Sequence, residues 1–347
     1  MIWHNGSYKA LPERFPLWSE ELAPMPLPSD GARTLVLTAF LRGSASGHDG
    51  GSFSTATNLL KHVSGLVRRS PGLCGEGTLH VVHDNERFRH NETYGIARLH
   101  YFAADPSMPP GDARWRMFAH VLRSEAAGGW ECAWATDMTD VDVLRLPPCS
   151  TSYYGEARLA VGTDACGLKP AWLRDVARRA NYTLASSALR AFLNERDHQV
   201  HRRRQTLNCG LVGGLRATIL PLIDQMSDRM ARHHGQVPPP PHIPMDMLFW
   251  NEVVLEMEAQ RRAPIVSGYP LGPVNLPMWG GLSDQTAFCP RHADPWLGQR
   301  VVCSGQCKVA WVNATIGHYW FGHKLKSWWT RFNADELKRG GRRPSCV

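Results

Sequence analysis

One stretch near the start of the chain is almost wholly apolar: Thr34-Leu35-Val36-Leu37-Thr38-Ala39-Phe40. A short apolar run of this kind predicts a buried strand. The Gly- and Ser-rich segment 43–52 follows it, and apolar residues then recur at helical spacing before the Pro71-Gly72 break: Leu59, Leu60, Val63, Leu66 and Val67. The fold therefore begins with a strand, a loop and a helix.

Strand and helix patterns keep alternating further along the chain. Strands are predicted at 79–82, 99–102, 132–135 and 207–212, and helices at 112–123, 170–180, 215–230 and 245–260. This order predicts an α/β fold with a mostly parallel central sheet flanked by helices. In such sheets the ligand lies beyond the carboxyl ends of the strands. We expect residues 1–31 to form an N-terminal arm, 32–333 the domain and 334–347 a basic C-terminal tail.

The composition limits the class of protein and its partners. The chain has 347 residues, of which 43% are hydrophobic and 20% charged, and this balance is typical of a globular protein. No apolar run reaches the ~18 residues that cross a bilayer, so we expect membrane attachment only through an anchor absent from this chain. The net charge of +8 favours anionic partners such as phosphates. The densest basic run, His201–Arg204, lacks interleaved aromatic residues, so we interpret it as a solvated face and expect no nucleic acid partner.

Two features bear on the cellular compartment. Asn-X-Ser/Thr acceptor sites favour a glycoprotein of the secretory lumen, including the Golgi, over a cytoplasmic protein; they lie at Asn5, Asn91, Asn181 and Asn313. The nine Cys are odd in number, so at least one thiol stays free or pairs between chains.

Three carboxylates follow the strand predicted at 132–135: Asp137, Asp140 and Asp142. At the ligand-binding edge of a sheet, buried carboxylates need a cation to neutralise them. Mg²⁺ and Mn²⁺ take oxygen ligands and are commonly shared between carboxylates and phosphates. The segment therefore predicts a metal site that binds a diphosphate, and the alternative is an acidic loop that caps a helix.

Asp140-Val141-Asp142 resembles the Asp-X-Asp motif of the GT-A glycosyltransferases, and Asp137 together with Asp140 resembles a variant spacing, Asp-X-X-Asp-Val. The resemblance implies a Rossmann-like GT-A fold and a Mn²⁺ or Mg²⁺ ion held by these aspartates. It implies a nucleotide-diphosphate sugar as donor and a glycan, protein or small-molecule hydroxyl as acceptor. The metal would stabilise the negative charge on the leaving diphosphate.

Two later segments come in the order that the resemblance implies. Asn208-Cys209-Gly210 is similar to the family's Asn-X-Gly segment, in which Asn208 would be catalytic and Gly210 and Gly213 would let the donor approach the backbone. The alternative is a bulged strand whose glycines permit tight packing. Asp246 resembles the acidic start of a helix that reaches the acceptor or sugar, where it would act as a base or support the sugar. It is equally suited to capping its own helix.

The C-terminal segment from Gly317 to Trp328 resembles a His-aromatic-X-Gly-X-X-Lys-Pro-Trp segment of the glycogenin-like retaining group. By this resemblance His318 would complete the metal site and Lys326 would contact the diphosphate. The segment departs from the pattern, because the spacing from His318 to Lys326 is longer and Ser327 replaces the Pro. The same histidines compete for another site, since Cys303, Cys307, His318 and His323 approximate the ligands of a zinc finger.

The nucleotide would contact the ends of the first two predicted strands, at Thr38, Ala39, Phe40 and Asp84. A turn explains His83-Asp84-Asn85 equally well. No Walker-type phosphate loop occurs, and no Gly-X-Gly-X-X-Gly follows the first strand. A second hypothesis is a non-catalytic glycan- or nucleic-acid-binding module, whose ligand stacks on the aromatic residues of the basic tail: Trp320, Trp328 and Trp329.

Overall fold

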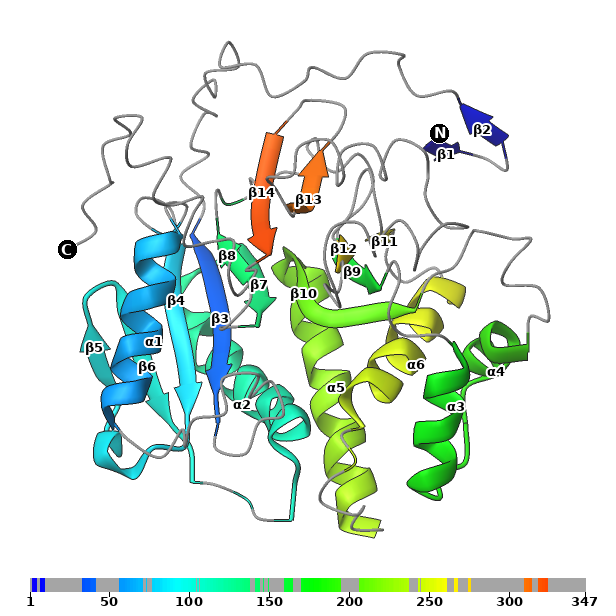
Figure 1. Cartoon of the computed structure of the whole chain (residues 1–347), viewed down its shortest axis with the longest axis horizontal. Helices are drawn as coiled ribbons and strands as arrows, with labels where there is room; N and C mark the ends of the chain where they lie inside the picture. Colours follow the sequence, from blue (N-terminus) through cyan, green and yellow to red (C-terminus); the bar gives the residue numbers. More distant parts are fainter. Residues whose placement is uncertain are drawn as a thin grey trace, which may run out of the picture.

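The computed structural model describes the central part of the chain most fully. The described residues are 2–4, 7–9, 33–41, 56–70, 73, 77–103, 105, 107–137, 141–143, 146, 149, 159–164, 170–194, 206–236, 243, 245–260, 265–267, 274–275, 309–313 and 318–323. They form a layered arrangement of helices around a central sheet (Figure 1).

The largest sheet of the described residues has nine strands in the order β11-β9-β10-β7-β3-β4-β6-β5, with β12 beside β9. Its centre consists of four parallel strands: β6 (Ala97–Tyr101), β4 (Gly77–His83), β3 (Thr34–Phe40) and β7 (Cys132–Thr136). The α/β class and the mostly parallel centre of the sheet are therefore confirmed. Because parallel strands end at the same edge, the residues that follow β3, β4 and β7 lie along one side of the sheet.

The sheet becomes mixed beyond β7. The strand β10 (Leu207–Leu215) runs antiparallel both to β7 and to β9 (Leu159–Asp164). β11 (Ile265–Ser267) and β12 (Val274–Asn275) are parallel to β9, and β5 (Glu92–Tyr94) forms an antiparallel edge beside β6. The amino end of β10 thus reaches the same edge as the carboxyl end of β7.

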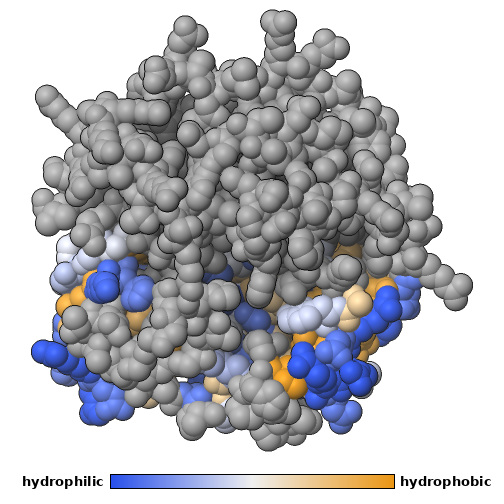
Figure 2. Space-filling model, in the orientation of Figure 1, coloured by the Kyte–Doolittle hydropathy of each residue, from blue (hydrophilic) through white to orange (hydrophobic). Residues whose placement is uncertain are grey.

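Helices cover both faces of the sheet. One face packs on α1 (Ala56–Arg69), whose side chains at helical spacing, Leu59, Val63 and Leu66, are fully buried with Val36 of β3. The opposite face packs on five helices: α2 (Pro110–Ser124), α3 (Pro170–Arg179), α4 (Ser187–Asn194), α5 (Arg216–Gln236) and α6 (Asp246–Ala259). On the side shown in Figure 2, the coloured surface is mostly hydrophilic, with apolar atoms in small separate areas.

The helices α2 and α6 are joined by aromatic packing. Trp115 and Trp250, both almost fully buried, stack with ring centroids 5.2 Å apart. Such rings bury a large apolar area and fix the relative position of the two helices. The starts of α2 and α6 carry the polar residues of the candidate site, so this packing positions the site.

The remaining described strands form two smaller sheets. β1 (Ile2–His4) and β2 (Ser7–Lys9) pair within the predicted N-terminal arm. β8 (Val141–Val143), β14 (His318–His323) and β13 (Val309–Asn313) form an antiparallel sheet in the order β13-β14-β8. Figure 1 shows β14, in orange, beside β13. Two short 3₁₀ helices, η2 (Glu86–Phe88) and η3 (Glu125–Gly128), complete the described elements.

The predicted strands and helices are present with shifted bounds. The strand predicted at 207–212 extends to Leu215, which was expected to open the next helix and instead ends β10. The strand β9 and the helix α4 were not predicted, because β9 ends in Gly162, Thr163 and Asp164 and α4 has only eight residues. No helix among the described residues is long and apolar enough to span a bilayer.

Candidate functional site

Asp137 directly follows β7 and lies beside β10. Its backbone N–H donates to the Gly210 carbonyl over 2.9 Å, continuing the antiparallel ladder in which Leu211 faces Thr136. The pairing of β10 with β9 shifts register between Asn208 and Val212, which marks a bulge. The Asn-X-Gly segment thus lies inside the strand predicted at 207–212, and the register shift agrees with the alternative of a bulged strand.

Arg114 connects two of the carboxylates that were predicted from separate motifs. Its Nη1 lies 2.6 Å from Asp137 Oδ1, and its Nη2 lies 3.1 Å from Asp246 Oδ2. The side chains are largely enclosed, with 14% of Arg114, 32% of Asp137 and 13% of Asp246 exposed. One guanidinium from α2 therefore joins the end of β7 to the start of α6.

The charge of Arg114 is stabilised by its neighbours. Burial lowers the pKa of the guanidinium, but Cys209, Asp137 and Asp246 raise it, and the net result is a raised pKa. An arginine already keeps its proton at all ordinary pH values, so these contacts strengthen a permanent charge. Removing this cation would leave two enclosed carboxylates facing one another.

Cys209 is the third group at Arg114. Its Sγ lies 2.9 Å from Arg114 Nη2 and 3.6 Å from Asp246 Oδ2, and it is the free cysteine of the described residues. Burial, followed by the charge of Asp246, raises the pKa of the thiol well above its ordinary value. The thiolate is the nucleophilic form of cysteine, so Cys209 is a packing residue of the site and not its nucleophile.

Two glycines let the backbone approach these side chains closely. A Cβ on Gly210 would lie 2.5 Å from Asp137 Oδ2 and 2.9 Å from Asn208 Oδ1, and one on Gly111 would lie 3.1 Å from Asp246 Oδ2. At Gly213 a Cβ would overlap the Trp134 indole ring. Gly210 thus lies within the polar site, whereas Gly213 accommodates the buried Trp134.

Asn208 is held at the bulge from both sides. Its Oδ1 accepts a hydrogen bond from the Gly210 backbone N–H over 2.6 Å. The preceding residue, Leu207, is bound through both backbone groups by the buried Asn251 of α6, over 2.9 Å in each case. Asn251 therefore ties the start of β10 to the helix that begins at Asp246.

Asp246 is the first residue of α6, and its two carboxylate oxygens have different partners. Its Oδ1 accepts from the Met247 backbone N–H over 2.8 Å, as a residue at the start of a helix does, while Oδ2 faces Arg114. The residue is 9% exposed. Four residues of the polar site, Asp137, Asn208, Gly210 and Asp246, thus come together from distant positions in the sequence.

The residues predicted to contact the nucleotide lie at the ends of β3 and β4. In the parallel register Thr38 faces Val81 and Phe40 faces His83, so Asp84 follows beside the end of β3. Thr38 and Phe40 are 0% and 4% exposed, and Ala39 is half-buried. Among the described residues the Thr38 hydroxyl has no hydrogen-bond partner. These positions share an edge with Asp137, since β7 is parallel to β3.

The segment after β4 has a local role. The Asn85 side chain accepts from the Arg87 backbone N–H and caps η2, and the Asn85 N–H donates to His83 Nδ1 over 3.2 Å. Asp84 is buried at 5% exposure. The turn interpretation therefore accounts for His83 and Asn85.

The metal ligands predicted from sequence are described only in part. Asp140, Lys326, Cys303 and Cys307 lie outside the described residues, and Asp142 and His318 are described by their backbone. No group of three or more potential metal-ligating side chains occurs among the described residues. Of the predicted metal ligands, Asp137 has a described side chain, and its carboxylate is already bonded to Arg114.

The backbone register places the C-terminal strand beside the acidic segment. β14 pairs antiparallel with β8, so that Gly322 faces Asp142 and His323 faces Val141. His318 lies at the other end of β14, where it faces Asn313 of β13. Neither candidate histidine is paired with Asp142, because His323 faces Val141 and His318 faces Asn313.

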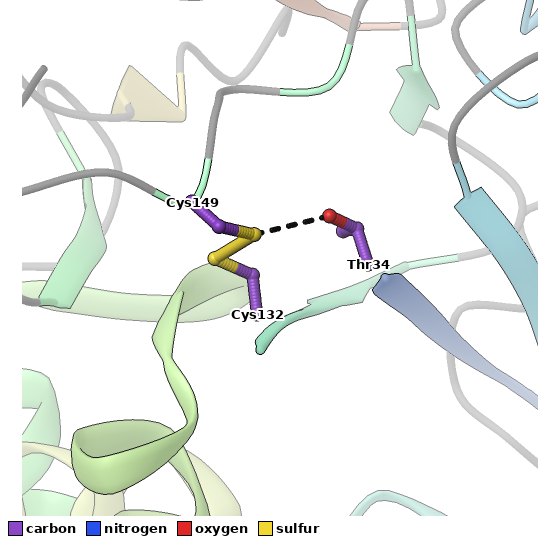
Figure 3. The surroundings of a disulfide bond; sticks show 3 residues. All are labelled: Thr34, Cys132 and Cys149. Atoms are coloured by element: carbon purple, nitrogen blue, oxygen red, sulfur yellow. Dashed lines mark hydrogen bonds between the residues drawn. A yellow bond between two sulfur atoms is a disulfide. The ribbon is translucent and has the colours of Figure 1, made fainter. Parts of the chain in front are cut away.

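A disulfide lies at the opposite end of β7 (Figure 3). Cys132 bonds to Cys149, and the Cys149 Sγ lies 3.2 Å from the Thr34 hydroxyl at the start of β3. The link closes a loop that contains β7, Asp137 and β8. It ties Cys149, which follows β8 in the sequence, to the first residue of β7 near the centre of the sheet.

Arg114 is the site residue that the sequence did not reveal. It lies within a predicted amphipathic helix, where an arginine is expected to face solvent. No local pattern marks it, because its contacts with Asp137 and Asp246 join residues that are far apart in the chain.

No protein-family model matches this chain, and the search of curated proteins also gave no match.

Proposed function

We propose that the protein is a metal-dependent glycosyltransferase of the GT-A type, which moves a sugar from a nucleotide-diphosphate donor to an acceptor hydroxyl. The observation that carries the proposal is the meeting of Asp137, Asn208 and Asp246 at the carboxyl edge of the parallel strands. These residues were chosen from three motifs in separate parts of the sequence, and ligands of α/β sheets bind at this edge.

Carboxylate and imidazole groups are suitable ligands for a divalent cation, and we propose that the ion lies at β8. We assign it to Asp140 and Asp142, together with one histidine of β14. The register does not select His323 over His318, because His323 pairs with Val141, and Val141 and Asp142 lie on opposite faces of β8. Asp137 is less suited, because Arg114 neutralises its carboxylate. A bound Mn²⁺ or Mg²⁺ supplies positive charge to the oxygens of the departing diphosphate.

The other predicted site residues act on the sugar and the nucleotide. Asp246 presents a carboxylate whose direction is fixed by Arg114, which suits it to orient an acceptor hydroxyl or to support the sugar. Asn208 and the narrow backbone at Gly210 border the sugar. Thr38, Ala39, Phe40 and Asp84 border the nucleotide, and Lys326 contacts the diphosphate. The resemblance of the C-terminal segment favours retention of the anomeric configuration.

The proposal is tested by thermal unfolding with a panel of UDP- and GDP-sugars, each with and without Mn²⁺. A ligand that binds the folded state raises the melting temperature. We expect at least one donor to do so only with Mn²⁺, and we expect Asp140→Ala and Asp142→Ala to abolish the shift. Asp175→Ala, which removes an exposed carboxylate on α3, is the matched control and should preserve it.

A different result would support the binding-module hypothesis. If a glycan or oligonucleotide stabilises the chain without metal, and if Asp140→Ala leaves that shift unchanged, the transferase proposal is wrong. If a nucleotide sugar stabilises the chain with Mn²⁺ instead, release of nucleoside diphosphate from that donor measures the activity directly.

A further inference from the structure

Asp112 lies next to the candidate site but does not line it. Its side chain is fully buried, and its Oδ1 accepts hydrogen bonds from the backbone N–H groups of Met245 and Asp246 over 2.9 and 2.8 Å. These N–H groups stand at the start of α6, where a helix has no internal partners for them. A carboxylate is favoured at this end because the helix dipole is positive there.

The same helix holds Asp246 in two ways. Asp112 and Arg114 both belong to α2, and while Asp112 binds the backbone of Asp246, Arg114 binds its carboxylate. Gly111, directly before Asp112, leaves the space that the carboxylate needs. The position of Asp246 is therefore set by one turn of α2.

His234 contacts the other oxygen of Asp112. Its Nε2 lies 2.9 Å from Asp112 Oδ2, and its side chain, near the end of α5, is 4% exposed. The net pKa of Asp112 is raised to about 6: burial raises it most, the hydrogen bond with His234 opposes this, and the charge of Asp246 adds to the rise. His234 thus helps to keep Asp112 in the charged form that binds two N–H groups.

We propose that Asp112 and His234 form a positioning pair, which holds Asp246 in its working orientation through the backbone of α6. The inference rests on the proposed glycosyltransferase function for its catalytic consequence. Its structural part, the fixing of the first turn of α6, stands on the contacts of Asp112 alone. Neither residue touches substrate in this arrangement.

Asp112→Ala and Asp112→Asn separate the pair's role from general stability. The alanine variant loses both N–H contacts, and we expect kcat for release of nucleoside diphosphate to fall by about tenfold or more, with KM for the donor within about twofold. The asparagine variant keeps an oxygen that accepts from both N–H groups, and it should stay within about threefold of the parent kcat. The donor is the nucleotide sugar that gives the largest thermal shift with Mn²⁺.

The matched control is Glu252→Gln, which alters a fully buried carboxylate further along α6 that binds Arg229 and Tyr182. It should lower the melting temperature and leave kcat unchanged. If it lowers kcat as much as Asp112→Ala at an equal loss of stability, the pair is structural only and the proposal is overturned. If Asp112→Ala does not fold, His234→Leu replaces it, with an expected loss of about threefold or more in kcat. His234→Gln, which restores an N–H near the Nε2 position, should recover most of that loss.

A readout without catalysis distinguishes failure of this inference from failure of the proposed function. Loosening the start of α6 should speed amide hydrogen exchange in peptides that cover Met245 and Asp246 and speed maleimide labelling of Cys209, which lies 3.6 Å from Asp246. If the parent chain turns over no nucleotide sugar, the proposed function fails, and these rates still decide whether Asp112 and His234 hold Asp246. Unchanged exchange and labelling in folded Asp112→Ala would refute the pair.

Discussion

The chain buries ionisable side chains in two different ways, and helix α2 borders both. Near its start, Arg114 lies between Asp137 and Asp246, and every charge has an opposite partner. Near its end, His120 lies close to a group of histidines in which His80 Nδ1 is 2.9 Å from His100 Nε2. Burial, then the charge of His100, lowers the pKa of His80 to about 3. The first cluster keeps its charges by pairing them, and the second avoids charge by losing protons.

Removing the cation should break the first cluster with the largest effect. We expect Arg114→Met to lower the free energy of unfolding by about 3–5 kcal/mol, because the enclosed carboxylates of Asp137 and Asp246 lose the cation that they share. Urea denaturation at pH 7.5 measures the change. Adding Asp246→Asn should recover part of the loss, since one uncompensated charge is then removed. Arg116→Met, in which an arginine of the same helix that is 60% exposed is replaced, should change stability by less than about 0.5 kcal/mol.

A covalent link provides a reference that depends on neither cluster. Cys132 and Cys149 are 17 residues apart, and closing a loop of this length restricts the unfolded chain. We expect Cys149→Ser to cost about 3 kcal/mol of unfolding free energy. Neither sulfur titrates while bonded, so the loss should be equal at pH 8 and pH 6. A loss that grows with falling pH would indicate that the disulfide acts by supporting one of the charged clusters.

Acid should act on the histidine cluster. The pKa of His80 is about 3 in the folded chain and 6.5 when unfolded, so the unfolded state binds more protons below pH 6.5. Stability is therefore fully present above pH 6.5 and is lost as the pH falls toward 3. For His80 alone the loss between pH 8 and pH 5 is about 2 kcal/mol. Denaturation of His80→Gln across this range should give a flatter pH dependence than the parent, and an equally steep curve would show that other groups dominate.

The contrast also explains what could be predicted from the sequence. The strand Thr34–Phe40 and the helix that follows it were predictable, because hydrophobic periodicity is local and burial enforces it. The position of Asp137 at the ligand-binding edge followed from the rule for parallel sheets. A place for Asp246 at the same site was implied by the family resemblance of its segment, and the proposed roles of both carboxylates stay predictions.

The partners of those carboxylates could not be predicted. Arg114 and Asp246 are 132 residues apart in sequence, and Asp112 reaches Met245 over a similar separation. A charged residue in an amphipathic helix has the same sequence pattern whether it faces solvent or a second helix. Likewise, the antiparallel entry of β10 and the register of β14 against β8 depend on strand pairing, which local patterns do not encode.

The prediction with the smallest expected effect concerns Arg98, which pairs with Glu125 and also lies near the histidines that lose their protons. Arg98 lies 3.1 Å from Glu125 and its side chain is 47% exposed, so Arg98→Gln should change stability at pH 8 by less than about 1 kcal/mol. The positive charge of Arg98 also lowers the pKa of both His80 and His100, after the larger effect of burial. Without it these pKa values rise toward 6.5, fewer protons separate the folded from the unfolded state, and the variant should lose less stability than the parent between pH 8 and pH 5.

If the Arg98–Glu125 ion pair is instead what matters, the variant should be less stable than the parent by the same amount at both pH values. Parallel denaturation curves at pH 8 and pH 5 separate the two results, because the sign of the difference at low pH is opposite to that expected from losing an attractive contact.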